Sequence, residues 1–220
     1  QIFVATAEPS LFFQGEVHVF QRTLTGWSET QVLAAPAPAG QDSFGHDLAL
    51  SGNRLLVAQP NTTEVHEFER IDGVWTPRAT ILAPAGAVGF GIAVDLDGTR
   101  ALVGARSGPF AGPMEGAYVF ERDAGGWNLA QHLLPHGAND DEGLLTIALA
   151  GDFALIGAQL SDVRIHSEAG HDEGASWLFV RGASGWVEAG TLGAPMPESR
   201  DGFGAALALA ADGSALIGVP

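Results

Sequence analysis

The sequence predicts an all-β protein in which one small antiparallel sheet is repeated along the chain, and three observations support this. Tryptophan recurs in the same local phrase at Trp27, Trp75, Trp127 and Trp186, with spacings of 48, 52 and 59 residues. A strand-like segment ending in Phe-x-Arg precedes each of these tryptophans. Glycine contributes 30 residues, and no segment keeps the apolar stripe of a helix. Because periods of about 20–50 residues containing several strands are typical of solenoids and propellers, we expect a β-propeller of four-stranded antiparallel blades.

The first strand of each unit is expected to begin at a Phe-Gly pair. The pairs are Phe44-Gly45, Phe90-Gly91 and Phe203-Gly204, and the third unit lacks one, so its first strand is expected near residues 143–149. A turn rich in Gly, Asp and Asn follows each strand, and these residues suit the tight connection of a hairpin.

The second strand is apolar at successive positions instead of alternating. The runs are 55–58, 101–105, 154–158 and 215–219. Since both faces of such a strand must be covered, we expect each sheet to be packed between two neighbours.

The third and fourth strands complete each unit as a meander. The third ends in Phe-x-Arg, at residues 15–22, 63–70, 115–122 and 174–181. The fourth runs from the tryptophan to Leu33, Leu82, Leu133 and Leu192.

The repeat divides the chain into approximate units 1–43, 44–88, 89–142, 143–202 and 203–220. Residues 1–7 match a second strand, so we count about four units plus one surplus strand. Propellers usually close with about 4–8 blades. We therefore expect a single propeller domain that is a piece of a larger ring, completed by further blades or another chain; closure in an unusual way is the alternative.

Composition narrows the possible functions. The formal net charge is −16, and all ten basic residues are arginine. Such a chain repels phosphate backbones, so we expect no nucleic-acid partner. Cysteine is absent, which excludes disulfides, thiolate catalysis and cysteine-based zinc sites. No run reaches the roughly 18 apolar residues of a transmembrane helix.

At these repeated positions the sequence resembles FG-GAP repeats, the blades of integrin α-subunit propellers and of many bacterial surface proteins. The matching segments are the three Phe-Gly pairs together with Ala58-Gln59-Pro60, Gly104-Ala105, Gly157-Ala158 and Gly218-Val219-Pro220. The resemblance implies a propeller, commonly seven-bladed, that works in extracellular binding and adhesion and not in catalysis. It also implies an extracellular, cell-surface or periplasmic location, of a bacterial kind.

Many FG-GAP blades hold Ca²⁺ in an Asp-rich loop between the first two strands, and this sequence departs from that pattern. Only Asp95 and Asp97 remain in a turn of that kind. A hard cation needs several converging oxygens. We therefore expect no Ca²⁺ in these hairpins, and no other cofactor.

Two groups of residues are candidates for ligand binding. The long segment 159–173 contains His166, His171 and Asp172, which could bind a transition metal or form a solvated polar loop. Asp42, Asp141 and Asp201 each fall about two residues before a first strand. They could form a ring of carboxylates around a central channel, or accept backbone N–H groups at the entry to each strand.

The repeated tryptophans also have two interpretations. They could pack between blades or present rings on which sugars stack. Trp177 is out of phase with the other four, so its role is considered separately from theirs.

Three functions follow, in order of preference. The first is a non-catalytic module that presents the loops of one face to a protein or polymer. The second is a carbohydrate-binding propeller. The third is a polysaccharide hydrolase or lyase with paired acids, although the chain contains no G-x-S-x-G, H-E-x-x-H or phosphate-binding motif.

Overall fold

The computed structural model describes residues 1–6, 15–37, 43–106, 114–137, 145–161, 173–196, 198 and 201–220. Within these ranges the chain forms β-strands and one short 3-10 helix, η1 (Pro60–Thr62), which confirms the all-β class. The described residues contain no helix with the length and apolar character that a membrane crossing requires.

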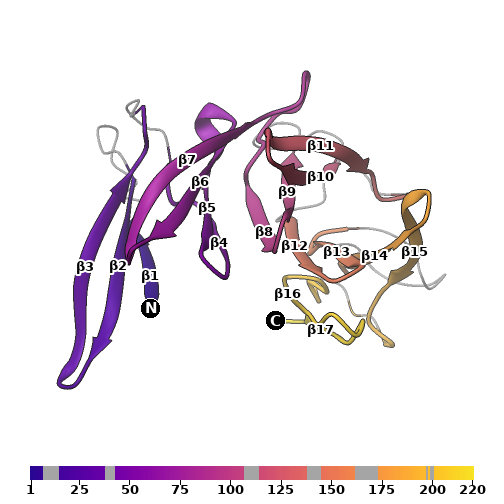
Figure 1. The fold of residues 1–220 in the computed structure, drawn as a ribbon. Coiled ribbons are helices and arrows are strands. Elements are labelled where there is room, and N and C mark those ends of the chain that lie inside the picture. The colour runs from indigo at the N-terminus through magenta and orange to yellow at the C-terminus, as the bar shows by residue number, and fades with distance from the viewer. Residues whose placement is uncertain are drawn as a thin grey trace.

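The strands of the described ranges form five antiparallel sheets, which we number in chain order, and neighbouring strands in each sheet are consecutive in the sequence (Figure 1). The first sheet comprises β1 (Ile2–Thr6), β2 (Glu16–Thr23) and β3 (Gly26–Ala34). The second comprises β4 (Leu48–Ser51), β5 (Arg54–Gln59), β6 (Glu64–Ile71) and β7 (Val74–Leu82). The third comprises β8 (Ala93–Asp97), β9 (Arg100–Arg106), β10 (Met114–Asp123) and β11 (Gly126–Leu133). The fourth comprises β12 (Leu145–Ala150), β13 (Phe153–Ala158), β14 (Ala175–Gly182) and β15 (Gly185–Leu192). The fifth comprises β16 (Ala206–Leu209) and β17 (Ala215–Gly218).

Four of the sheets share one register at their last hairpin. The arginine of Phe-x-Arg lies opposite the repeated tryptophan in the pairs Arg22–Trp27, Arg70–Trp75, Arg122–Trp127 and Arg181–Trp186. A β-bulge directly precedes the phenylalanine in each of these hairpins, as at Glu67/Phe68. Since a bulge bends a strand and increases its twist, the sequence repeat encodes a repeated local shape.

The Phe-Gly pairs lie in turns ahead of the first strands, so the prediction that those strands begin at Phe44 and Phe90 is wrong by three or four residues. Gly45 and Gly91 have φ angles of 88° and 90°, which favour glycine and turn the chain before the strand starts. Phe44 and Phe90 are fully buried. Phe203-Gly204 lies in the same way before β16, with a φ of 93° at Gly204.

An apolar layer separates each of the first three sheets from the next, and the second strands of these layers contribute buried residues to it. In β5, Leu55 and Val57 pack toward the first sheet, and Leu56 and Ala58 pack toward the third. The prediction of sheets covered on both sides is therefore confirmed for the second sheet. The last strand, β17, has no such cover in the described part of the chain, and Leu216 is 77% exposed.

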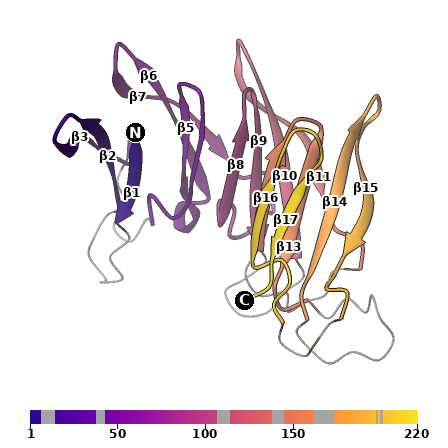
Figure 2. The same cartoon turned by 90° about the horizontal axis from the view of Figure 1, so that it is seen from below.

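The sheets stack face to face in chain order and diverge from a shared inner edge. The first strands β4, β8, β12 and β16 lie beside one another, whereas β7, β11 and β15 lie on the outside (Figures 1 and 2). In a meander of this kind, the hairpin turns between strands one and two and between strands three and four lie at one end. The other connections, such as residues 60–63 and 83–92, lie at the opposite end, which we call the loop face.

Candidate functional site

Carboxylates on the inner strands bind backbone N–H groups of the next sheet. Asp47 Oδ2 accepts from Val94 N at 2.7 Å, Asp95 Oδ2 from Leu149 N at 2.6 Å, and Asp97 Oδ2 from Gly151 N at 2.8 Å. Val94 and Leu149 are on the edge strands β8 and β12, and Gly151 is in the turn after β12, so the carboxylates accept from donors at the sheet edges. These inner acids therefore join the sheets.

Asp47 and Asp95 are also mostly buried, and burial changes their acidity. Desolvation raises the pKa of Asp47 and of Asp95 above its ordinary value, and the hydrogen bonds from Val94 and Leu149 partly oppose this. The second oxygens of Asp47 and Asp95 accept from Leu48 N at 2.9 Å and Leu96 N at 2.8 Å. Backbone donors thus occupy both oxygens of each carboxylate.

A glutamine clamp joins the outer strands of two pairs of sheets. Gln31 on β3 donates to Trp75 O at 2.7 Å and accepts from Trp75 N at 2.9 Å. Gln131 on β11 forms the same two bonds with Trp186, at 2.7 and 2.8 Å. Each glutamine lies four residues after its own tryptophan, where the second sheet has Ala79.

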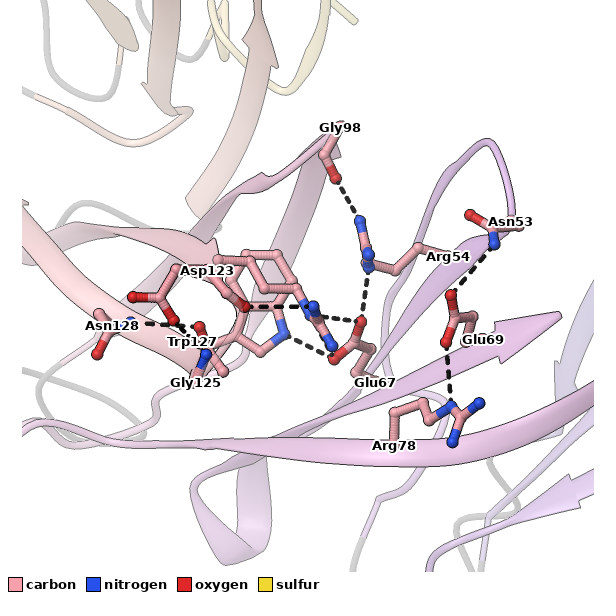
Figure 3. A network of polar contacts seen from close by, with 12 residues as sticks. Asn53, Arg54, Glu67, Glu69, Arg78, Gly98, Asp123, Gly125, Trp127 and Asn128 are labelled. Atoms are coloured by element: carbon pink, nitrogen blue, oxygen red, sulfur yellow. Dashed lines mark hydrogen bonds and ion pairs between the residues drawn. The ribbon is translucent and has the colours of Figure 1, made fainter. Parts of the chain in front are cut away.

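A buried glutamate replaces this clamp between the second and third sheets. Figure 3 shows Glu67, whose side chain is 0% exposed, between Arg54 of its own sheet and Trp127 of the next. Its oxygens lie 2.6 Å from Arg54 Nε and 2.9 Å from Arg122 Nε, and Trp127 Nε1 donates at 3.0 Å. This network is fully satisfied and links two sheets, so its role is structural.

The tryptophans mainly pack between sheets and offer little ring surface for sugars. Trp75 and Trp186 are 3% and 4% exposed, and Trp177 is fully buried and donates to His136 O at 3.1 Å. Among these tryptophans, Trp27 is the most exposed residue, at 52%, because no described sheet covers its side of the first sheet. The idea of a repeated sugar-stacking platform is therefore wrong for the buried members.

Most of the ligand-binding residues expected from the sequence fall outside the described ranges: Asp42, Asp141, His166, His171 and Asp172. Asp201 lies within them, and its Oδ2 accepts a hydrogen bond from Glu198 N at 2.7 Å. The donor lies three residues before Asp201 and not at the entry to β16, so this bond is local and differs from the strand-entry bond expected from the sequence.

The loop face contains a pocket between the second and third sheets. Its volume is about 490 Å³, and its lining comes from both sheets: Ser43, His46, Pro60, Asn61, Thr63, Val88, Gly89, Ile92 and Arg106. Arg106 and His46 supply nitrogen donors, and Pro60, Val88 and Ile92 supply apolar surface. No described lining residue is acidic. The pocket therefore differs from the acidic surface expected of this chain.

The backbone around the pocket is held in unusual conformations. Ser43 and Thr63 have φ angles of 56° and 59°, which cost of order 1–3 kcal/mol each for residues other than glycine. Gly89 has a φ of 58°, and a Cβ there would lie 2.7 Å from Arg106 O. Only glycine permits this approach of the 83–92 connection to the end of β9.

Arg106 can be recognised in the sequence by its position in the repeat. The backbone N–H groups of Gly45, Gly91 and Gly204 donate to Ala58, Gly104 and Gly218. This places Arg106 at the repeat position that Pro60 and Pro220 occupy. The corresponding residue of the fourth unit is Gln159, so among these four positions the third unit has the charged residue.

The described residues contain no group of three or more His, Asp or Glu side chains that could hold a metal ion.

No protein-family model and no curated protein matches the chain. Among solved structures, a functionally unknown protein from Desulfotomaculum acetoxidans DSM 771 is similar in fold, with a TM-score of 0.55 and 11% identity. That similarity covers 100% of this chain and 73% of the other. The computationally designed Ika4 protein also matches, with a TM-score of 0.41 and 13% identity over 82% of this chain and 93% of the other. The similarity to the Desulfotomaculum acetoxidans protein concerns the fold alone.

Proposed function

We propose that the sheets are blades of an FG-GAP-type β-propeller and that the chain is a non-catalytic binding module of an exported bacterial-type protein. The repeated register and the shared inner edge of the sheets support the propeller. The loop face would contact a protein partner.

The incomplete sheets support a ring with further parts. In the described ranges, the first sheet lacks a strand equivalent to β4, and the fifth lacks strands equivalent to β6 and β7. We propose that further blades or another chain complete them.

The pocket between the second and third sheets is the observation that carries the binding proposal. It lies on the end of the molecule formed by the irregular connections, where propeller ligands can reach side chains from two blades at once. Backbone hydrogen bonds join parts of its wall: Arg106 N donates to Val88 O at 3.0 Å, and Thr63 N donates to Pro60 O at 3.1 Å.

The structure gives the two alternatives less support. A carbohydrate-binding propeller would depend on Trp27, since the equivalent rings of Trp75 and Trp186 are buried. A hydrolase or lyase would need free paired acids, whereas Asp47, Asp95 and Asp97 accept backbone hydrogen bonds near the inner edge.

Labelled protein applied to arrays of synthetic peptides and of polysaccharide fragments tests this proposal. We expect peptide binding that a double variant, His46→Ala with Arg106→Ala, loses. Arg22→Ala is the matched control, because Arg22 is exposed and lies near a hairpin turn at the opposite end. Binding only to glycans, with loss in Trp27→Ala, would favour the carbohydrate alternative, and binding to neither array would contradict the proposal.

A further inference from the structure

We propose that the pocket on the loop face binds a peptide carboxylate that lies beside an aliphatic side chain. This inference rests on the proposed function, because it assigns a ligand class to the same face. The carboxylate would belong to a peptide C-terminus or to an acidic side chain.

Arg106 is the first basis for this assignment. Arg54, Arg78, Arg100, Arg122 and Arg181 all form ion pairs with carboxylates. Within the described ranges, no such pair involves Arg106, although its backbone N–H donates to Val88 O at 3.0 Å. A chain with 26 acidic and ten basic residues has carboxylates in excess. Among the described residues Arg106 thus has no carboxylate partner and lines a pocket, so its guanidinium is the group that we assign to a carboxylate from outside.

The chemistry of the lining selects the charge of the ligand. Guanidinium groups bind carboxylates through two parallel hydrogen bonds, which gives both strength and orientation. His46 and the Ser43 hydroxyl add further donors around the same space. The described lining contains the charged group of Arg106 and no acid, on a chain of net charge −16. An acidic ligand would therefore be repelled elsewhere and accepted here.

The apolar part of the lining indicates what lies next to the carboxylate. Pro60, Val88 and Ile92 form this part, and Val88 is 50% exposed. An aliphatic side chain placed there removes apolar surface from water on both molecules. The volume of about 490 Å³ is suited to one or two residues of a peptide.

The same lining favours a peptide over an acidic sugar. Sugar sites usually present an aromatic ring on which the pyranose stacks. No Trp, Tyr or Phe is among the described residues that line this pocket. Carboxylate and aliphatic groups occur side by side at a peptide C-terminus that ends in leucine, and in a Glu-Leu pair.

NMR titration of the isotope-labelled chain with four probes tests the proposal. The probes are an acetylated Gly-Gly-Ser-Leu peptide with a free C-terminus, its amidated twin, an acetylated and amidated Gly-Glu-Leu-Gly peptide, and trigalacturonate. We expect at least one carboxylate peptide to bind in the millimolar range or tighter, with shifts at residues around the pocket. Loss of the charged hydrogen bonds should weaken binding about tenfold or more. We expect this loss when the free leucine peptide is replaced by its amidated twin, and also when the unmodified chain is replaced by Arg106→Gln. If only the glutamate peptide binds, an acidic side chain is the source.

Two further variants separate charge recognition from folding. Arg106→Lys keeps the charge and should retain more binding than Arg106→Gln, whereas Arg22→Gln removes one charge at the opposite end and should bind as the unmodified chain does. Measurable binding of the leucine peptide that is equal in its free and amidated forms, binding by Arg106→Gln that equals that of the unmodified chain, or binding of trigalacturonate alone would overturn the carboxylate-peptide assignment. In that case the peptide and polysaccharide arrays described above would still show whether the loop face binds a partner, so the proposed function is tested independently of the carboxylate. Absence of binding for all four probes would overturn this inference as well.

Discussion

At the scale of single residues, Glu67 is a fully buried carboxylate that is shared between two sheets. Arg54 and Arg122 approach it with side chains that are 15% and 25% exposed. Burial of a charge is costly unless hydrogen bonds and countercharges compensate it, and here both arginines and Trp127 do so. The equivalent position in the next sheet is Val119, and there Trp186 Nε1 is buried without a hydrogen-bond partner in the described part of the chain. The polar network is thus specific to the junction of the second and third sheets, which also contains the pocket.

Replacing Glu67 by glutamine should lower the free energy of unfolding by about 3 kcal/mol, because two arginines lose their countercharge in a mostly buried site. Glu121→Gln is the control, since the Glu121–Arg181 pair is more than two-fifths exposed on each side chain and should contribute only about 0–1 kcal/mol. Urea denaturation of both variants measures the difference. Equal effects would show that Glu67 is not a structural junction.

Asp95 gives a prediction about pH. Burial raises its pKa in the folded protein above the unfolded value of 3.8. The folded state therefore holds the proton more tightly, and stability from this group is present below pH 3.8 and is lost as pH rises through the raised pKa. Asp95→Asn cannot titrate, so its stability relative to the unmodified chain should increase between pH 3.5 and 7. Urea unfolding across this range measures it, and a relative decrease would show that the N–H bonds outweigh desolvation.

At the scale of elements, the outer strands are joined by side chains that reach the backbone of the next sheet. Gln131 and Gln31 each make two bonds of 2.7–2.9 Å to a tryptophan N–H and carbonyl. Such bonds leave the strand pairing within each sheet intact. They fix how far along the strands one sheet lies relative to its neighbour.

Gln131→Ala should therefore destabilise the chain by about 2 kcal/mol, since two part-buried hydrogen bonds of about 1 kcal/mol each are lost. Gln21→Ala on the exposed end of β2 should change the free energy of unfolding by less than about 0.5 kcal/mol. Thermal and urea unfolding compare the two. A Gln131→Ala variant as stable as Gln21→Ala would exclude the clamp.

The sequence was sufficient to predict the strands, because their periodicity and turn chemistry are local properties. The order of the strands and the burial of β5 on both faces followed from it. The first strands were placed too early, since Phe-Gly is compatible with a strand until the positive φ of Gly45 is known. Glu67 could not be predicted as buried, because its partners Arg122 and Trp127 lie more than 50 residues away in the chain. The pocket depends in the same way on Ser43 and Arg106, which only the packing of two sheets brings together.

At the scale of the whole molecule, the sheets diverge from a common inner edge. This arrangement places β4 next to β8 and leaves β7 farther from β11 (Figure 1). It also brings the irregular connections of neighbouring sheets together on the loop face, where the pocket forms. A stack of parallel sheets would keep all equivalent strands at one spacing, about 10 Å.

Spin-label distances test this divergence most directly, and the absence of native cysteine allows clean labelling. One doubly labelled variant carries Asn53→Cys and Thr99→Cys on equivalent turns of the inner strands, and the other carries Pro77→Cys and Leu129→Cys on equivalent positions of the outer strands. We expect electron paramagnetic resonance to give a shorter distance for the inner pair than for the outer pair, each with a narrow distribution. Equal distances, or a longer inner distance, would contradict a radiating arrangement and with it the propeller.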